Sequence, residues 1–331
     1  MNLQERIKIL TELGKYILSN DPAWQTAKQV AYQKNPWFTE AFVDLSATHI
    51  ATQFLTEEHL TKWARHYFLD DQITPRTVGI VMAGNIPLVG FHDFLSVFIS
   101  GHKQRVKCSS KDQILLEHLI HKMAQWNPAV REKVELAEML KDCDAYIATG
   151  SDHTSRYFDY YFGRYPSVIR KNRTSVAVLN GNENEQDLEL LSDDIMQYFG
   201  LGCRNVTQIF VPENYNFVPL LNALKKYSYF FDHHKYRNNY DYQLAIYLMN
   251  NQYYMTNDCI VMVENNNPFS PIGTLHYSYY QTQEEVLHNL TGDERIQAIV
   301  NTKHIPFGQA QKPQLMDYAD GVDLMQFLLT L

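Results

Sequence analysis

The sequence has few of the features that mark membrane, zinc-binding or disulfide-rich proteins. Among its 331 residues are only four cysteines (Cys108, Cys143, Cys203 and Cys259), and no CxxC pair exists, which argues against a zinc knuckle or a redox dithiol. No apolar run approaches the roughly 18 residues of a membrane span. The N-terminal segment MNLQERIKILTELGKYIL carries charges among its apolar positions and has no small-residue cleavage site, so it is not a signal peptide.

Basic clusters are also scarce. Lys and Arg number 29 against 37 Asp and Glu, which gives a formal net charge of -8. An electrostatic nucleic-acid binder is therefore not expected. Few cysteines and no signal peptide predict reduced thiols and a cytoplasmic location. Tyrosine, by contrast, is abundant, with 22 residues, and its amphipathic ring suits interfaces or a long pocket.

The chain length predicts about two domains. Residues 1 to about 70 have helical periodicity. Short β-rich runs at 77–83, 104–107 and 144–150 then alternate with helical segments at 87–101, 111–126 and 151–162, a pattern typical of βαβ units and a parallel sheet.

The second half has the same mixed character. The expected strands are 205–212, 259–264, 272–280 and 295–301, and the expected helices are about 185–199, 213–254 and 283–290. We therefore predict an α/β protein. A basic turn at 170–173 suggests a boundary between domains 1–172 and 173–331.

Cys203 is the first candidate for chemistry, because it lies in Gly200-Leu201-Gly202-Cys203-Arg204 between a helix and a strand. Two preceding glycines let another group approach the sulfur closely, and Arg204 would favour the thiolate. A structural role is about equally compatible, since cysteine is often buried and glycines end helices. The other three cysteines lack this context and are interpreted as structural.

Two turns at expected strand ends are the next candidates. Gly84-Asn85 ends one strand and opens a helix, so the Asn85 amide could donate to an oxyanion; the alternative is an ordinary turn. Gly150-Ser151 follows another strand, where a helix N-terminus suits a phosphate; the alternative is a simple helix cap. Lys107, at the end of a third strand, could reach a ribose or phosphate, or be merely solvated.

Metal and simple dinucleotide motifs are absent. His233-His234 and the pair His118 and His121 have no third ligand at regular spacing, so no metal site is expected. Gly200–Asn205 imitates part of GxGxxG, but a helix rather than a strand precedes it.

Taken in order, these motifs resemble the aldehyde dehydrogenase superfamily. That family has a Trp-Asn-x-Pro segment, a Lys-Pro-Ser segment, a Thr-Gly-Ser turn and a Gly-Gln-x-Cys nucleophile. The segments ATGSDHTSRYFDYYFGRYPSVIRKNRTSVAVLNGNE, YFGLGCRNVTQIFVPENY and PFGQAQKPQLMDYADGVDLMQFL resemble more closely the LuxC-like fatty acyl-CoA reductases of bacterial luminescence. The resemblance covers about residues 75–331.

This resemblance implies a parallel-sheet cofactor domain, a catalytic domain and a role for each candidate residue. Cys203 would be the nucleophile and Asn85 the oxyanion donor. Lys107 would hold the adenosine side of NADPH, and Gly84, Gly150 and Ser151 would lie at the cofactor. Phe307-Gly308 matches a late Pro-Phe-Gly segment of the family.

Two departures from the family pattern bear on the reaction. The glutamate base of hydrolytic members, in Glu-Leu-Gly-Gly, has no counterpart in Val168-Ile169-Arg170-Lys171, and Asn267-Pro268-Phe269 stands where a ribose-binding glutamate precedes a Phe. The first departure favours exchange with CoA over hydrolysis, and the second leaves the cofactor geometry open.

The resemblance therefore implies NADPH-dependent reduction of an acyl-CoA to an aldehyde through a Cys203 thioacyl-enzyme. Two alternatives stay open: an acylating aldehyde dehydrogenase running toward acyl-CoA, and a non-catalytic nucleotide- or acyl-binding protein on the same fold. A homo-oligomer is compatible with the resemblance. Acyl chain length, NADPH against NADH, and acyl-CoA against an acyl-protein or acyl-phosphate donor are not determined by sequence.

Overall fold

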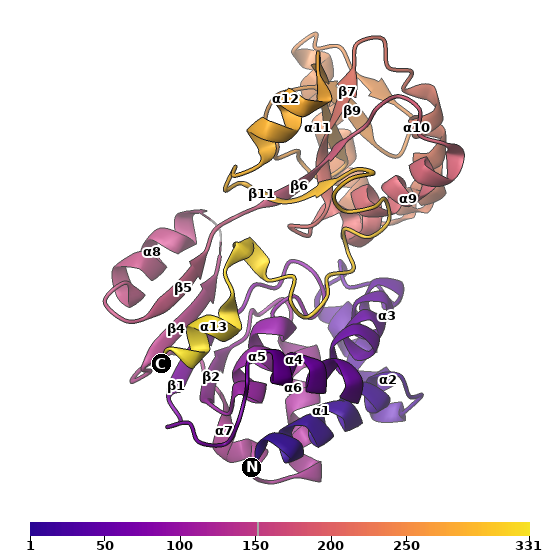
Figure 1. Cartoon of the computed structure of the whole chain (residues 1–331). Helices are drawn as coiled ribbons and strands as arrows, with labels where there is room; N and C mark the ends of the chain where they lie inside the picture. The colour runs from indigo at the N-terminus through magenta and orange to yellow at the C-terminus, as the bar shows by residue number, and fades with distance from the viewer. Residues whose placement is uncertain (151) are drawn as a thin grey trace. The chain divides into compact units, whose positions relative to one another are not determined.

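The computed structural model describes residues 1–150 and 152–331, which form two units (Figure 1). Unit 1 comprises residues 1–172 and 314–331, and unit 2 comprises residues 173–313. The chain therefore leaves unit 1 after Asn172 and returns to it after Pro313. The sequence-based division, which places the whole of 173–331 in the second domain, is wrong for the tail.

The tail belongs to unit 1 because its apolar and hydrogen-bonding side chains are satisfied there. Helix α13 (Leu324–Leu329) buries Leu324, Met325 and Leu328 in the core of unit 1. A hydrogen-bond chain precedes it: Trp63 Nε1 donates to the Tyr318 hydroxyl (2.9 Å), which donates to the Tyr67 hydroxyl (3.0 Å). A sequence pattern of helical spacing predicts α13 but not the surface against which it packs.

Unit 1 begins with the expected helical segment. It contains α1 (Leu3–Ile17), α2 (Pro22–Lys34), α3 (Glu40–His49), the π-helix η1 (Ile50–Phe54) and α4 (Glu57–His66). Helix α1 starts at a capping box, in which the Asn2 side chain accepts from the Glu5 N–H and the Glu5 carboxylate accepts from the Asn2 N–H. Pro22 occupies the first turn of α2, as its fixed φ favours.

Sheet A of unit 1 is parallel throughout. Its strands are β1 (Thr77–Val81), β2 (Lys103–Lys107), β3 (Val134–Leu136), β4 (Ala145–Thr149) and β5 (Ser167–Arg170), in the order β3-β2-β1-β4-β5. The connecting helices are α5 (Phe91–Ser100), α6 (Gln113–Trp126), the short α7 (Val130–Lys133) and α8 (Asp152–Phe162). The predicted parallel α/β arrangement is confirmed.

Sheet B of unit 2 has the order β11-β6-β7-β10-β9-β8. Its strands are β6 (Thr174–Val178), β7 (Val206–Pro212), β8 (Met255–Thr256), β9 (Val261–Glu264), β10 (Thr274–Tyr280) and β11 (Ile296–Val300), and only β8 pairs antiparallel. The helices are α9 (Glu185–Met196), η2 (Gln197–Gly200), α10 (Val218–Leu224), η3 (Lys225–Asp232), α11 (His234–Met249) and α12 (Gln283–Leu290).

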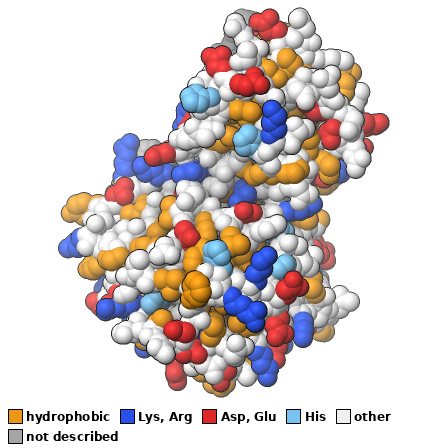
Figure 2. All heavy atoms as spheres, in the orientation of Figure 1, with side chains coloured by type: hydrophobic (Ala, Val, Ile, Leu, Met, Phe, Trp, Pro, Cys, Tyr) orange, Lys and Arg blue, Asp and Glu red, His pale blue; other side chains and the backbone are white. Residues whose placement is uncertain are grey.

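Local differences from the sequence prediction are small. Strands β3 and β8 and helix α7 were not predicted, and α5 begins at Phe91 rather than at Pro87 because residues 86–90 form turns. Acidic and basic side chains are mixed over the visible face of the molecule (Figure 2). Within residues 1–150 and 152–331, no helix is both long and apolar enough to cross a membrane.

Candidate active site

The carboxyl ends of strands β1, β2 and β4 bring the candidate residues of unit 1 to one edge of sheet A. Lys107 lies opposite Val81, at the end of β1, and Ala148 of β4 lies opposite the same residue on the other side. Gly84 and Asn85 follow β1 directly, and Gly150 follows β4. The chain order reverses between β1 and β4, and ligands bind at such switch points in open α/β sheets. Ser151 lies outside the described residues.

The Asn85 loop is held by buried side chains from two other elements. The hydroxyl of Ser46, on α3, donates to the Pro87 carbonyl at 2.7 Å. The carboxylate of Asp112 accepts the backbone N–H groups of Leu88 and Val89. Leu88 has a left-handed φ of 56°, a conformation that a branched side chain adopts only under external support. The loop that carries Asn85 is therefore fixed from outside itself.

Asp112 contacts the Asn85 loop instead of capping its own helix. It occupies the N-cap of α6 but makes no side-chain capping bond there. Burial raises the pKa of its carboxyl well above the ordinary range, while the N–H groups of Leu88 and Val89 act in the opposite direction. The fold therefore gives up a normal cap to anchor the Asn85 loop.

The two glycines of this edge are required by packing. A Cβ at Gly84 would lie 2.5 Å from the Ser109 Oγ, and a Cβ at Gly150 would lie 2.9 Å from the Phe158 Cε2 and 3.0 Å from the Thr154 Cβ. Gly84 therefore lets the β1 loop contact the β2 loop, and Gly150 lets helix α8 pack against the end of β4. The exposed Lys107 side chain stands at the same edge.

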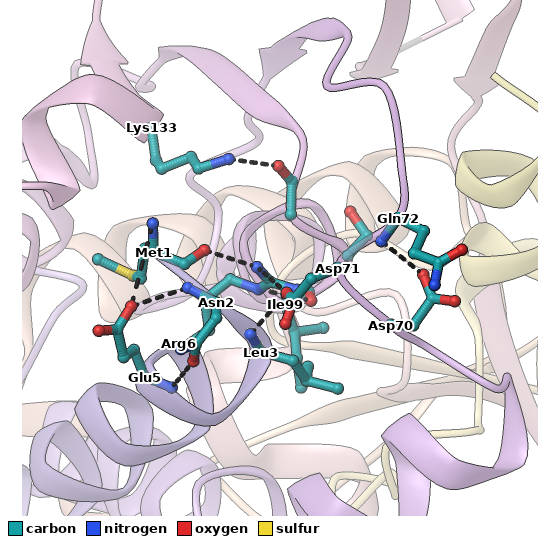
Figure 3. A network of polar contacts seen from close by, with 12 residues as sticks. Met1, Asn2, Leu3, Glu5, Arg6, Asp70, Asp71, Gln72, Ile99 and Lys133 are labelled. Carbon is teal, nitrogen blue, oxygen red and sulfur yellow. Dashed lines mark hydrogen bonds and ion pairs between the residues drawn. The ribbon is translucent and has the colours of Figure 1, made fainter.

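Helix α5, which follows the Asn85 loop, is anchored at its opposite end (Figure 3). Arg6 Nε donates to the Ile99 carbonyl at 3.1 Å, and Lys133 Nζ donates to the Gly101 carbonyl at 2.6 Å. Arg6 also donates to Asp71 Oδ1 at 3.2 Å. Cations at a helix C-terminus satisfy its unpaired carbonyls and oppose its dipole. The N-terminal segment thereby fixes the axial position of α5.

Cys203 of unit 2 lies in a loop with unusual backbone conformation. Tyr198, Phe199 and Gly200 all have left-handed φ values, of 54°, 58° and 73°. Both aromatic residues are buried, and the Phe199 ring contacts the Phe230 ring at 4.3 Å between centroids. Strain of this kind persists only where surrounding packing maintains it. The half-buried Cys203 thus follows a rigid turn rather than a flexible linker.

Asn205 links the Cys203 loop to the end of α9 by hydrogen bonds. Its fully buried side-chain amide donates to the carbonyls of Asp194, Ile195 and Gln197, the last at 2.8 Å, and its Oδ1 accepts the Gly202 N–H at 2.7 Å. The Ser175 hydroxyl donates to the Cys203 carbonyl at 3.0 Å. These bonds satisfy the end of α9 and hold the backbone at the Gly202 N–H and at the Cys203 carbonyl.

The other three cysteines are in settings that suppress the thiolate. Burial raises the pKa of Cys108 to about 12 and that of Cys259 to about 11, and it also raises the pKa of Cys143. The Cys259 Sγ lies 3.4 Å from the Leu224 carbonyl, to which it donates. Their assignment as structural residues agrees with these environments. No group of three or more metal-ligating side chains occurs within the described part of the chain.

The sequence and the structure were compared with those of known proteins. No protein-family model matches the sequence, and no curated protein matches it. Among solved structures, similar ones include the Mycobacterium tuberculosis aldehyde dehydrogenase complexed with NAD+ (12% identity, TM-score 0.62) and an NAD-dependent aldehyde dehydrogenase from Sinorhizobium meliloti (12%, 0.64). Each match covers 87% of this chain, with 70% and 68% of the respective neighbour.

The chain has the aldehyde dehydrogenase fold. The expected fold class is thereby confirmed, whereas the matches do not distinguish the LuxC-like branch. Within this aldehyde dehydrogenase fold, the segment that the sequence aligns with the family's Glu-Leu-Gly-Gly ends strand β5. Arg170 stands there, opposite Thr149 of β4, and its Nη1 donates to both carboxylate oxygens of Asp93 at 2.7 Å. No carboxylate occurs at 168–171.

The loop after β9, which contains Asn267-Pro268-Phe269, is anchored through its backbone carbonyls. Gln208 Nε2 donates to the Asn265 carbonyl at 3.0 Å, and the ring nitrogen Nδ1 of His276 lies 2.7 Å from the Asn267 carbonyl. Burial lowers the pKa of His276, so the neutral ring donates this bond. Side chains from β7 and β10 therefore hold the backbone of the 265–269 loop.

Sequence reasoning missed the residues that support the site: Ser46, Asp112, Asp194 and Asn205. A signal existed only for Asn205, which directly follows Cys203-Arg204 but was noted solely as part of a failed GxGxxG match. Asp112 and Asp194 lie in polar runs, Lys111-Asp112-Gln113 and Asp193-Asp194, that suggest solvated helix positions. Both carboxyls are nevertheless buried.

Proposed function

We propose that the protein is an acyl-CoA reductase that converts an acyl-CoA to the aldehyde through a Cys203 thioester, with NADPH as reductant. The aldehyde dehydrogenase fold supports the general class of nicotinamide-dependent aldehyde and acyl chemistry. The observation that carries the finer proposal is the end of β5 in unit 1, where Arg170 is bound to Asp93 and no carboxylate occurs at 168–171. The Cys203 loop of unit 2, held by Asn205 and Ser175, supplies the proposed nucleophile.

In the first step the Cys203 thiolate attacks the thioester carbonyl carbon. A tetrahedral oxyanion forms, the carbon–sulfur bond to CoA breaks, and CoA leaves as a thiolate that takes up a proton. Covalent catalysis of this kind divides one difficult step into two. The Asn85 side-chain amide is the proposed donor to the oxyanion, and one such donor contributes about 2.7–4 kcal/mol.

In the second step the Cys203 thioester is reduced. When bound, the reduced nicotinamide supplies a hydride. The thioacyl carbon becomes a thiohemiacetal, whose oxyanion would again accept from Asn85. Collapse of this tetrahedral oxyanion breaks the carbon–sulfur bond, expels the Cys203 thiolate and releases the aldehyde. Only one reductant is consumed, and the cysteine is regenerated.

The topology of sheet A supports a cofactor site at the carboxyl ends of its strands. The chain order reverses between β1 and β4, and open α/β sheets bind ligands at such switch points. In this proposal Gly150 and Ser151 bind the pyrophosphate, Lys107 lies on the adenosine side, and Gly84 is a further cofactor-binding residue.

The missing carboxylate at 168–171 favours CoA exchange over hydrolysis. Hydrolysis of a thioacyl-enzyme needs a base to remove a proton from water, and a positioned base contributes about 10²–10⁴-fold. The Arg170 guanidinium stays protonated at neutral pH and is buried against Asp93. It cannot act as that base.

Aldehyde formation tests this proposal. Purified protein is mixed with NADPH and saturated acyl-CoAs of several chain lengths, and aldehyde is trapped and quantified. We expect stoichiometric NADPH oxidation and aldehyde release by the parent and by Cys108→Ala, but none by Cys203→Ala. Turnover only with aldehyde, CoA and NADP+ would favour the acylating dehydrogenase direction. Nucleotide or acyl-CoA binding without any turnover would favour the non-catalytic alternative.

A further inference from the structure

Asp194 is a buried carboxylic acid in the last turns of helix α9, nine residues before Cys203. Its side chain is 1% exposed. Oδ2 accepts the Gly308 N–H at 2.6 Å, and Oδ1 accepts the Ala310 N–H at 3.0 Å. Both oxygens of one carboxylate therefore bind the segment 306–310, which lies far along the chain between β11 and the return to unit 1.

The backbone of the same residue binds the nucleophile loop. The Asp194 carbonyl accepts from Asn205 Nδ2 at 3.1 Å, and Asn205 in turn accepts the Gly202 N–H. Only one side chain, that of Asn205, separates the Asp194 carbonyl from the N–H of Gly202, the residue before Cys203. Asp194 thus contacts the 306–310 segment through its carboxylate and the Cys203 loop through its carbonyl.

The segment 306–310 is shaped to meet this helix. Gly308 has a left-handed φ of 77°, and a Cβ there would lie 2.7 Å from the Leu190 Cδ2. Leu190 lies one turn before Asp194 on α9, so both residues face the segment. Phe307 is 7% exposed and Ala310 is fully buried. The position of the segment on α9 is therefore set by shape as well as by the two hydrogen bonds.

We propose that Asp194 is a positioning residue that couples the Cys203 loop to the 306–310 segment, so that loss of its carboxylate loosens both segments together. The effect on acyl transfer rests on the proposed role of Cys203. The coupling of the two segments does not.

The ionisation of Asp194 adds a pH dependence to this coupling. Burial raises the pKa of its carboxyl to about 7, and the neighbouring Asp193 carboxylate acts in the same direction. The N–H groups of Gly308 and Ala310 and the Lys312 ammonium, all from the facing segment, lower it. The ionised carboxylate can accept both N–H groups. Because the net shift is upward, ionisation is less favourable in the attached segment than in an opened, solvated one, so the attachment is strongest below about pH 7 and weakens above it.

Residue-resolved amide hydrogen exchange of the whole protein tests the coupling directly. In Asp194→Asn, we expect exchange at Gly308, Ala310 and Gly202 to become about tenfold faster, because a buried charged hydrogen bond replaced by a mismatched donor costs at least that factor. Asp193→Asn is the matched control: it removes the same charge from the adjacent residue, whose carboxylate binds Lys226 and Tyr227 instead. Because the Asp193 carboxylate raises the pKa of Asp194, the two variants are compared at pH 8, where Asp194 is mostly ionised with or without Asp193. Exchange at the three amides should not change in the control at that pH.

The parent protein provides a second measurement that needs no variant. After correction for intrinsic exchange, Gly308 and Ala310 should be better protected at pH 6 than at pH 8, with Gly202 following in the same direction. If amide exchange in Asp194→Asn became faster at Gly308 and Ala310 but stayed unchanged at Gly202, the coupling would be overturned. Equal protection at both pH values would overturn the role of ionisation.

Acyl transfer then separates a positioning role from a purely structural one. In Asp194→Asn we expect the acylation rate of Cys203 at saturating acyl-CoA to fall about tenfold, with half-saturation changed less than about twofold. If the variant changed only the acyl-CoA concentration needed for half-saturation, and not the rate at saturation, the positioning role would be contradicted. If the parent protein itself is not acylated, the proposed function fails, while the exchange measurements still decide the coupling.

Discussion

Arg170 Nη1 lies 2.7 Å from both carboxylate oxygens of Asp93, and both side chains are buried in unit 1. Arg170 ends strand β5, whereas Asp93 lies in the first turn of α5, directly after the Asn85 loop. The ion pair therefore joins the end of the sheet to the helix that follows the proposed oxyanion donor. Removing one partner of such a pair leaves an unpaired buried charge.

Asp93→Asn should accordingly destabilise the protein by about 3–5 kcal/mol. The measurement is urea unfolding followed by tryptophan fluorescence, which reports on unit 1 because all four tryptophans lie there. Glu135→Gln is the control, since it breaks the exposed pair with Arg105 and should cost less than about 1 kcal/mol. If both variants lost the same free energy of unfolding, the buried Asp93–Arg170 pair would stabilise the protein no more than an exposed pair does.

The thioacyl-enzyme should survive in water. After acylation and removal of free acyl-CoA, release to fatty acid should be at least about 10²-fold slower than release driven by NADPH or by added CoA, because no carboxylate base stands at 168–171. A chase with water, thiol or NADPH measures the three rates. Hydrolysis as fast as NADPH-driven release would reveal a base elsewhere in the chain.

One thiol should react far faster than the others near neutral pH. Burial raises the pKa of Cys108, Cys143 and Cys259, so these residues remain thiols there. We expect one equivalent of rapid labelling by iodoacetamide, located at Cys203 by peptide mapping. The fast phase should vanish in Cys203→Ala and persist in Cys143→Ala; its survival in Cys203→Ala would contradict the assignment.

The Asn85 loop can be tested through its anchor. Asp112→Leu removes the acceptor of the Leu88 and Val89 N–H groups, and we expect the acylation rate to fall about tenfold. Asp112→Asn retains one acceptor oxygen and should restore most of the rate. Asn85→Ala, which removes the proposed donor itself, should cost about 10²–10³-fold. If both Asp112 variants behaved like the parent, the anchor would be irrelevant to acyl transfer.

The titration of Asp194 should contribute to how the free energy of unfolding changes with pH. Its pKa is raised from 3.8 to about 7, so between about pH 4 and pH 7 the native state holds a proton that the unfolded state has released. Its contribution to the free energy of unfolding therefore falls as pH rises through this window, by up to about 4 kcal/mol.

Asp194→Asn has no such proton to release. Comparison of the two proteins by urea unfolding at pH 5 and pH 7.5 should show a larger loss of stability in the parent over that interval. Parallel changes in the two proteins would mean that Asp194 does not titrate there.

Much of the fold was predictable because its signals are local. The apolar runs 77–83 and 144–150 are long and bounded by Gly or Asn, and both form central strands of sheet A. Strand β3 (Val134–Leu136) was missed because three residues after a short helix carry no periodicity. The return of residues 314–331 to unit 1 depends on Tyr318 reaching Trp63, a contact between positions 255 residues apart that no local pattern contains.

The residues of the candidate site likewise include some that the sequence predicts and others that it does not. Glycine, turn residues and a cysteine at element boundaries identified Gly84, Asn85, Gly150 and Cys203 as candidates from sequence. The side chains that hold these loops were not visible, because Asp112 and Asp194 act by being buried against distant backbone amides. Burial of a carboxylate is a property of the folded chain, and a polar run such as Ser192-Asp193-Asp194 suggests the opposite.

Covalent acylation of Cys203 is the measurement that tests the central claim most directly. The protein is mixed with acyl-CoAs of different lengths in the absence of cofactor and examined by intact and peptide mass spectrometry. The account predicts one acyl adduct, on Cys203, which disappears on addition of NADPH with release of aldehyde and is absent from Cys203→Ala. No adduct with any chain length, or an adduct on another residue that persists in Cys203→Ala, would contradict it.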